Sequence, residues 1–325
     1  MPLIRRTLKP VAGSLIGAFW GATKVITLQG ALSVFVYHDV SNNPSEFSRM
    51  YNLNVKPDIF DYQLNFIKKN FNIISPNELL SNRVPPKAAL ITFDDGMRSF
   101  FVNAIPILGK YGIPAIIFLN MGPIKGEVFW SGLITYLCNK RYDFVEHCAE
   151  NKVLAKGNMP LYLFCTKEIV ELYLRKKQGS FENEVSDFVG EFAAEEDLER
   201  AAEKGNIFFG NHLFNHHVPL LMSDEDLLES FSKNANELKK YRNYRDMFSF
   251  PFGQPGTCFS EKQASMILSN GAKRVFSSDG AINYDSASSY LHRISLSSFN
   301  DSDSKIWFQI FRKSVGRKTM ESKTK

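Results

Sequence analysis

The chain has 325 residues, of which 44% are hydrophobic and 22% are charged, and its formal net charge is +5. These values are typical of a globular protein and argue against a disordered or fibrous chain. The charge is modest and no basic helix carries interleaved aromatic residues, so nucleic acid is not an expected partner. The four cysteines form no CxxC pair, and we expect free thiols in a reducing compartment.

The N-terminus combines charge and apolarity. Arg5 and Arg6 precede an apolar run over residues 11–22, which includes Phe19 and Trp20. The run is too short for a transmembrane helix, and no small-residue cleavage site follows it as in a signal peptide. We expect a helix within residues 1–28 that either packs on the domain or lies at a membrane surface. A cytoplasmic protein with peripheral contact to the inner face of the membrane is the corresponding expectation.

Short apolar runs predict about seven strands in chain order. They cover residues 33–37, 88–93, 114–119, 206–209, 247–250, 274–276 and 291–296. Helical periodicity predicts helices over residues 56–70, 99–111, 224–241 and 261–269. This alternation indicates a parallel α/β fold, and the strand number favours a distorted (β/α)7-type barrel.

Strand signals fade between residues 122 and 204, where charged helical stretches dominate at 167–177 and 182–204. We therefore predict one domain over residues 1–325, with a core at 33–120 and 205–312. Residues 122–204 would form a mostly helical insertion.

Polar residues follow the predicted strands at the point where each strand ends or the next begins. They are His38, Asp94, Asp95, His212, His216 and His292. In parallel α/β folds, active sites lie at the carboxyl ends of the strands. The sequence therefore predicts a site at this rim.

Asp94 and Asp95 end the apolar run at 88–93. Two adjacent carboxylates at the end of a buried strand repel each other and lose solvation, and a cation would compensate both costs. Because neighbours on an extended backbone point in opposite directions, one carboxylate can bind metal while the other handles a proton. A plain Asp-Asp-Gly surface turn is the alternative, but it would not need the preceding apolar strand.

His212 and His216 are four residues apart, a spacing that places both on one face of a helical turn and lets them bind one metal ion. A pair of capping or core histidines has the same spacing, and the adjacent His217 could also be the second ligand. Together with a carboxylate from another strand end, two histidines leave coordination positions open for water and substrate.

Three segments resemble the motifs of the polysaccharide deacetylase superfamily (carbohydrate esterase family four), in the order in which that family has them. They are Thr-Phe-Asp-Asp-Gly at 92–96, His-Leu-Phe-Asn-His at 212–216 and Phe-Pro-Phe-Gly at 250–253. The resemblance covers residues 33–120 and 205–296. It implies a distorted (β/α) barrel and a divalent metal cofactor, with zinc as the expected ion.

The resemblance also implies roles for single residues. Asp94 would be the general base, and Asp95 would bind the metal with His212 and His216. The general acid would be His38, within Tyr-His-Asp at 37–39, with a histidine late in the chain as the reserve. That reserve candidate is His292.

Two positions depart from the family pattern. Many members have an arginine that tunes the catalytic aspartate at the position of Ser249, so Arg98 or Arg293 would have to replace it here. Phe252 stands where tyrosine is commoner, and only its backbone N–H would be needed to bind the oxyanion.

These observations predict a metal-dependent hydrolase that removes an N-acetyl group from an amino sugar of a glycan or glycolipid, in cell-surface polysaccharide biosynthesis. Phe129 and Trp130 begin the insertion and are candidates for a wall against the sugar ring. One alternative is an amidase that acts on a non-sugar amide. Another is a non-catalytic glycan-binding barrel, whose support is the missing arginine at position 249.

Overall fold

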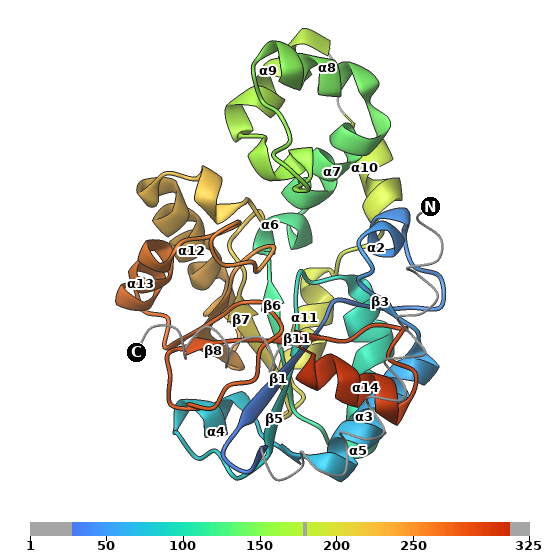
Figure 1. The fold of residues 1–325 in the computed structure, drawn as a ribbon, viewed down its shortest axis with the longest axis vertical. Coiled ribbons are helices and arrows are strands. Elements are labelled where there is room, and N and C mark those ends of the chain that lie inside the picture. The colour runs from blue at the N-terminus through green and yellow to red at the C-terminus, as the bar shows by residue number, and fades with distance from the viewer. Residues whose placement is uncertain (1–27, 178–180, 313–325) are drawn as a thin grey trace.

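Parallel strands form the centre of the molecule. In the computed structural model, which describes residues 28–177 and 181–312, nine strands make one sheet with the order β10-β9-β8-β7-β6-β5-β1-β11, and β4 pairs with β5 (Figure 1). Their bounds are β1 Leu32–Tyr37, β4 Asn72–Ile73, β5 Ala88–Phe93, β6 Ala115–Leu119, β7 Ile207–Asn211, β8 Tyr244–Ser249, β9 Arg274–Phe276, β10 Tyr290–Leu291 and β11 Ile294–Ser295. Every ladder between these strands is parallel.

The sheet curls so that its two ends approach each other. β10 and β11 are the outer strands, yet only His292 and Arg293 separate them in the chain. The loop before β10 also reaches the first strand, because the backbone N–H of Leu32 donates to the carbonyl of Asn283 at 2.8 Å. The strands β1, β5 and β6 are buried along their whole length, as the continuous apolar runs indicate. The fold is a distorted (β/α) barrel, which confirms the predicted class.

The strands differ from the prediction where they are short. The run at 291–296 is interrupted after Leu291, where the N–H of His292 donates to the side chain of Asn283 at 2.7 Å instead of to a neighbouring strand. A separate two-stranded sheet, β2 (Asp39–Val40) with β3 (Asn54–Val55), and strand β4 are also present. Each has two residues, too few to show a periodic pattern.

Helices surround the barrel. They are α2 Glu46–Met50, α3 Pro57–Asn70, α4 Pro76–Leu80, α5 Ile105–Tyr111, α6 Met121–Ile124, α11 Glu195–Ala202, α12 Asp224–Leu238, α13 Glu261–Ser269 and α14 Asp303–Phe311, with a 3-10 turn η4 at Pro219–Leu221. The predicted helix at 99–111 begins as a π turn, η2 (Phe100–Ala104). Pro106 cannot donate a backbone hydrogen bond, and the N–H of Ile105 pairs with Phe100, five residues back.

The predicted insertion forms a separate lobe at one end of the barrel (Figure 1). It consists of α7 Trp130–Lys140, α8 Tyr142–Glu150, η3 Leu161–Phe164, α9 Lys167–Lys177 and α10 Glu182–Val189. These helices share an apolar cluster that also takes in Phe47 and Met97 of the core. α10 ends at Gly190, whose φ is +88°.

The lobe is shorter than predicted. Within the stretch assigned to it, α11 packs with the barrel, because Leu198 and Ala201 belong to the main apolar core. The insertion therefore ends before residue 195 and not at residue 204.

The N-terminal helix was predicted within residues 1–28. All of these residues except Leu28 lie outside the described part. Within the described part, no helix has both the length and the apolar character needed to cross a membrane.

Candidate metal centre

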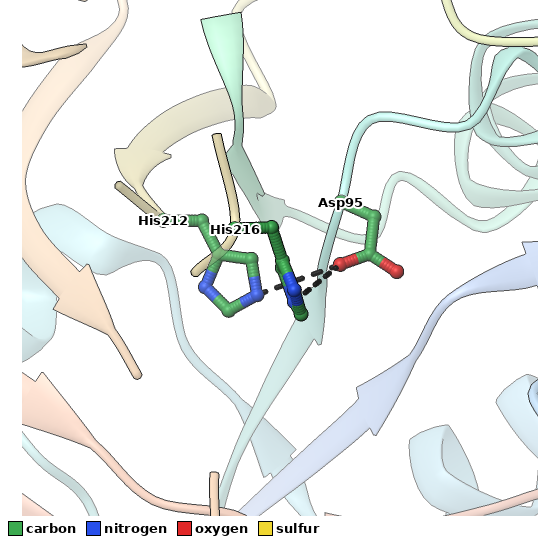
Figure 2. Close-up of side chains that lie close together, drawn as sticks. All are labelled: Asp95, His212 and His216. Atoms are coloured by element: carbon green, nitrogen blue, oxygen red, sulfur yellow. Dashed lines mark ion pairs between the residues drawn. The ribbon is translucent and has the colours of Figure 1, made fainter. Parts of the chain in front are cut away.

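Asp95, His212 and His216 converge at the carboxyl ends of β5 and β7. The Oδ1 atom of Asp95 lies 3.2 Å from Nε2 of His216 and 3.5 Å from Nε2 of His212 (Figure 2). One possible ligand atom from each residue lies within 4.8 Å of the others, and all three residues are buried. Two imidazoles and one carboxylate on a single point are a suitable ligand set for zinc and related divalent ions.

The loop after β7 that carries both histidines has a different backbone from the predicted one. Residues 212–218 are not helical, and Leu213 and His216 have φ values of +62° and +53°. A helical turn cannot hold these left-handed residues, so the predicted helical geometry is wrong although the two histidines do converge. Asp95 also has a positive φ, +74°.

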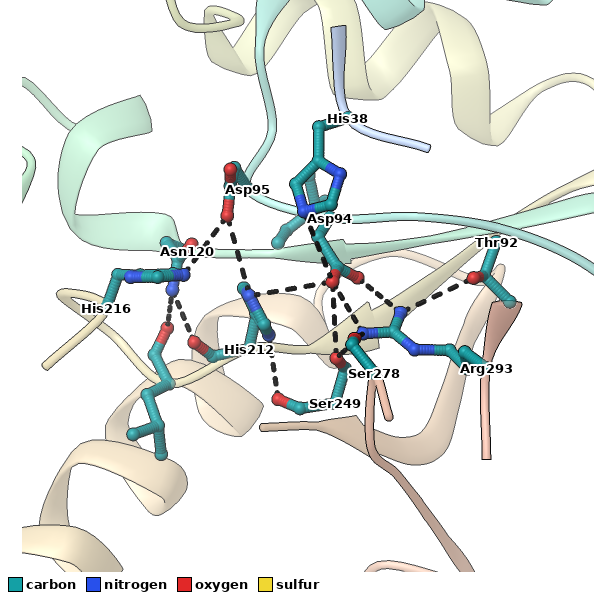
Figure 3. Close-up of polar contacts among 12 residues, drawn as sticks. His38, Thr92, Asp94, Asp95, Asn120, His212, His216, Ser249, Ser278 and Arg293 are labelled. Atoms are coloured by element: carbon teal, nitrogen blue, oxygen red, sulfur yellow. Dashed lines mark hydrogen bonds and ion pairs between the residues drawn. The ribbon is translucent and has the colours of Figure 1, made fainter. Parts of the chain in front are cut away.

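Hydrogen bonds hold this loop and orient one imidazole. The side-chain amide of Asn120 donates to the carbonyls of His212 and, at 2.8 Å, Leu213 (Figure 3). Nδ1 of His212 lies 2.7 Å from the carbonyl oxygen of Ser249, which places the ring proton on Nδ1 and leaves the Nε2 lone pair facing Asp95. Such partners fix the tautomer and direction of a metal ligand.

Local electrostatics fit a cation at this point. Asp95 Oδ1 is buried and accepts no hydrogen bond from the described residues. Burial alone would raise the pKa of Asp95, but its contacts with His216 and His212 hold that pKa well below its ordinary value. Burial lowers the pKa of His216, which favours the neutral imidazole that binds metal. Asp94 and Asp95 bring two negative charges to this point. The charge of Asp94 is paired with a buried arginine, Arg293, and a divalent cation would balance the charge of Asp95.

Asp94 is held by Arg293. The guanidinium donates from Nη1 to Oδ1 of Asp94 at 2.7 Å and from Nη2 to Oδ2 at 2.6 Å, and both side chains are buried. Arg293 also donates to the hydroxyls of Ser249 at 2.7 Å and Ser278 at 2.8 Å (Figure 3). Burial alone would raise the pKa of Asp94, but the charge and the hydrogen bonds of Arg293 outweigh this effect, so the pKa is lowered and the carboxylate is ionised.

These contacts decide between the two arginines that the sequence left open. Arg293 fills the space beside the small side chain of Ser249 and contacts Asp94. Arg98 pairs instead with Glu191 at 2.7 Å and with Asp197 at 3.8 Å, and half of its side chain is exposed.

The two candidate acids lie in different places. Nε2 of His38 is 3.9 Å from Oδ2 of Asp94, at the end of β1. Nδ1 of His292 lies 2.8 Å from Asp279, and His292 is not among the residues that line the cavity at the metal ligands. The structure therefore places His38, and not His292, beside Asp94.

A cavity of about 270 Å³ contains the three candidate metal ligands together with Asp94 and His38. Phe252 lines it, with its ring 4.9 Å from that of His216. Trp130, expected at the substrate, lies elsewhere: its ring packs against that of His217, tilted, with the centroids 4.4 Å apart, and both residues line a neighbouring cavity of about 310 Å³. His217 is therefore separated from the metal ligands, which leaves His216 as the second histidine.

Several residues of the site were not singled out from the sequence. Asn120 follows β6 directly, so the rule that placed the other polar residues at strand ends could have found it. Three of them line the cavity from outside the strands: Tyr51 in the loop after α2, Thr135 in α7 and Tyr162 in η3. No strand precedes them, and no periodic signal points to a site there.

Comparisons with known proteins agree with this site. A family model described as polysaccharide deacetylase matches residues 81–135, which include both aspartates. The chain is 26% identical over 176 residues to the poly-beta-1,6-N-acetyl-D-glucosamine N-deacetylase of Staphylococcus epidermidis, covering 46% of this chain and 60% of that protein. It is 32% identical over 94 residues to the Bacillus subtilis protein YxkH, whose name assigns it to the polysaccharide deacetylases, covering 27% of this chain and 31% of that protein. These matches thus span less than two thirds of either relative.

Solved structures share the fold at low identity. The Streptococcus pyogenes deacetylase PplD in complex with acetate superposes with a TM-score of 0.57 at 19% identity, over 86% of this chain and 98% of that one. IcaB from Ammonifex degensii gives a TM-score of 0.55 at 16% identity, over 86% of this chain and 97% of that one. The family model and the two relatives are thus similar to part of this chain as polysaccharide deacetylases, and the solved structures share its fold over most of its length.

Proposed function

We propose that this protein is a metal-dependent hydrolase that removes the N-acetyl group from an amino sugar of a glycan or glycolipid. The observation that carries the proposal is one cavity with two adjacent sets of groups. Asp95, His212 and His216 form a ligand set, and Asp94, paired with Arg293, lies beside His38.

Asp95, His212 and His216 would hold the cation, with zinc as the proposed ion. A divalent cation in such a site lowers the pKa of water and polarises an acyl carbonyl. The loop held by Asn120 and the Nδ1 contact of His212 keep the ligand atoms in place before the cation binds.

Asp94 acts as the general base. Its lowered pKa keeps it ionised at neutral pH, and the Arg293 contacts fix its plane. It takes a proton from the water that attacks the acetyl carbon, a role for which a positioned base is typically worth about 10²–10⁴ in rate.

His38 acts as the general acid, and the backbone N–H of Phe252 as an oxyanion donor. The amine of a sugar is a poor leaving group unless it is protonated, and His38 lies on the Asp94 side of the cavity, where it can donate that proton. Phe252 lines the same cavity with φ of +60°. A backbone donor there would stabilise the negative oxygen of the tetrahedral state.

The sugar substrate is proposed from the family and its relatives. The Staphylococcus epidermidis relative is named for a polymer of N-acetylglucosamine, and we extend that substrate class to this chain. A role in cell-surface polysaccharide biosynthesis follows from this substrate class.

The basic, apolar N-terminal sequence is the reason for including lipid-linked sugars and peripheral contact with the inner face of the membrane. Flotation of the full chain with anionic vesicles, compared with an Arg5→Glu/Arg6→Glu variant, tests that contact.

Acetate release tests the main proposal. The zinc-loaded full chain should release acetate from N-acetylated sugars, and Asp94→Asn should lose at least about a hundredfold in kcat while it still binds zinc. His212→Ala should lose the bound zinc in metal analysis. If neither acetate nor formate is released from any N-acylated sugar, the proposal fails; release only from non-sugar amides would identify an amidase instead. The Arg293 contact with Asp94 argues against a non-catalytic barrel, because it supplies the arginine that position 249 lacks.

A further inference from the structure

We propose that the cavity accepts a single N-acylated amino-sugar unit and holds it from one side, so that an oligosaccharide reacts only at a chain end. This inference rests on the proposed function and specifies its substrate. Four observations carry it: the roof over the metal ligands, the walls beside them, the size of the cavity and the position of its exposed residues.

The insertion forms a roof over the cavity. The ring of Tyr162 in η3 lies 5.9 Å from that of Phe252, nearly parallel to it, and 5.6 Å from that of Tyr51. The side-chain amide of Asn139 in α7 donates to the hydroxyl of Tyr51 at 3.2 Å. Tyr162 thus joins the barrel loop after β8 to the loop after α2, and an aromatic row closes the side of the cavity opposite the strands. A glycan cannot pass through that side.

Two side chains at the start of α7 wall off the neighbouring cavities. Phe129 packs against His216 at 5.1 Å and lines a cavity of about 910 Å³, while Trp130 covers His217 in the cavity of about 310 Å³. Neither of these cavities shares a lining residue with the cavity at the metal ligands. Sugar units on either side of the reacting one would have to displace a buried aromatic ring to enter them.

The cavity has room for little more than one sugar ring with its acyl group. Its volume is about 270 Å³. Cavities that enclose a drug-sized ligand are typically about 300–1,000 Å³, so two or three linked rings would not fit. Its aspartate and histidine lining side chains are Asp94, Asp95, His212, His216 and His38, all of them at the proposed reaction site. The remaining lining is neutral, as suits an uncharged sugar.

The exposed lining residues mark the entrance. Gln254 and Ser295 are exposed, and His38 and Ser278 are half-buried. Ser295 ends β11, His38 and Ser278 follow β1 and β9, and Gln254 lies in the loop after β8, so all four come from the barrel and none from the insertion. The reacting unit therefore enters beside the proposed acid, and the rest of the molecule stays outside.

Defined oligosaccharides test the inference. We would incubate the zinc-loaded full chain with N-acetylglucosamine and with its β-1,6-linked dimer, tetramer and hexamer, measure acetate per molecule, and locate the free amine by tandem mass spectrometry. The expected result is at most one acetate per molecule at every length, with the amine on a terminal unit. Acetate that increases with chain length, or amines at interior units, would overturn the inference and leave the proposed function intact. No acetate from any of these substrates would instead count against the proposed function.

A variant in the roof tests its cause. Tyr162→Ala removes the ring between Tyr51 and Phe252, and the hexamer should then lose several acetates where the wild type loses one. Tyr142→Ala is the matched control, because Tyr142 lies in the same insertion with 77% of its surface exposed and should keep the limit of one acetate. Cooperative thermal unfolding and the bound zinc content show that each variant is folded. A folded Tyr162→Ala variant that still releases one acetate per hexamer would contradict the roof as the cause of the limit.

Discussion

Arg293 shows how a contact of one residue depends on the closure of the whole sheet. It lies 199 residues from Asp94 in the chain and reaches it because β10 and β11 flank it at the two ends of the curled sheet. Arg98 is far nearer in sequence, so sequence alone could not choose between the two. The aspartates and histidines, in contrast, could be predicted individually, because each follows a recognisable apolar strand.

We expect Arg293→Gln to destabilise the protein by about 3–5 kcal/mol, because it leaves the buried Asp94 carboxylate without its partner. The pKa of Asp94 should rise, so the acidic limb of the kcat/KM profile should move to higher pH, with at least a tenfold loss of kcat/KM at neutral pH. Arg293→Lys should restore part of the activity by restoring the charge. Arg98→Gln is the control and should change little, since Arg98 faces Glu191 at the surface. Unfolding in urea and pH profiles measure both effects, and an unshifted profile for Arg293→Gln would contradict the role of the pair.

At the scale of elements, the strands were predictable and the loops were not. The long apolar runs at β5 and β6 match their strands because buried parallel strands are apolar on both faces. The loop that carries His216 was predicted as a helical turn. Its left-handed residues depend on contacts with Asn120 and with the backbone of α6, which lie far away in sequence. Tertiary contacts of this kind leave no local pattern.

Gly122 in α6 is one of these contacts, and substitution there should weaken metal binding. A Cβ atom at this position would lie 1.9 Å from Oδ1 of Asn215 and 2.8 Å from the carbonyl oxygen of Phe214, in the loop that carries His216. Gly122→Ala should therefore destabilise the protein by about 1–3 kcal/mol and lower zinc affinity. Gly109→Ala, where a Cβ atom meets nothing within 4 Å, should instead stabilise it by about 0.4–1 kcal/mol. Zinc titration with a competing chelator would check the difference, and equal affinities would be the contrary result.

Asp143 gives the insertion a pH-dependent contribution to stability. Hydrogen bonds from Arg141 and Lys177 hold the pKa of this carboxyl well below its ordinary value. Because the pKa of Asp143 is lowered in the folded state, its contribution to the free energy of unfolding is complete above the unfolded pKa of about 4. That contribution is lost as the pH falls below about 4. Asp143→Asn should lower the free energy of unfolding by about 1 kcal/mol or less at pH 7, as expected for a partly exposed pair.

The difference between Asp143→Asn and the wild type should shrink as the pH falls from about 4 toward 2. Denaturation with a chelator present, which removes any effect of bound metal, would measure it. Glu150→Gln, at the exposed end of the same helix, serves as the control. A constant difference across the acid range would show that the carboxylate charge is not responsible.

For the whole molecule, the sequence predicted a barrel with an inserted helical lobe, and the structure confirms the barrel. The limit of the lobe was misplaced because α10 and α11 form one charged helical stretch in sequence, and only the packing of Leu198 and Ala201 assigns α11 to the barrel. The aromatic contacts between lobe and barrel could not be predicted from the sequence either, because they join residues without a common periodicity.

Because the ligand set joins the ends of β5 and β7, cation binding should stabilise the whole barrel. Free zinc at about a hundred times its Kd should add about 2.7 kcal/mol to the free energy of unfolding, which corresponds to several degrees in Tm. A chelator should reverse the shift, and His216→Ala, which lacks one ligand, should show none. Thermal unfolding with and without zinc would test this. A full shift in His216→Ala would place the ion elsewhere.

The described groups proposed to carry out the reaction all belong to the barrel, and the lobe from α7 to α10 contributes none of them. The lobe is connected to the barrel by two short stretches, after α6 and at Gly190. These two junctions are natural points at which to splice in a different cap. An engineer could thereby change which molecules reach the reaction centre without rebuilding the centre itself.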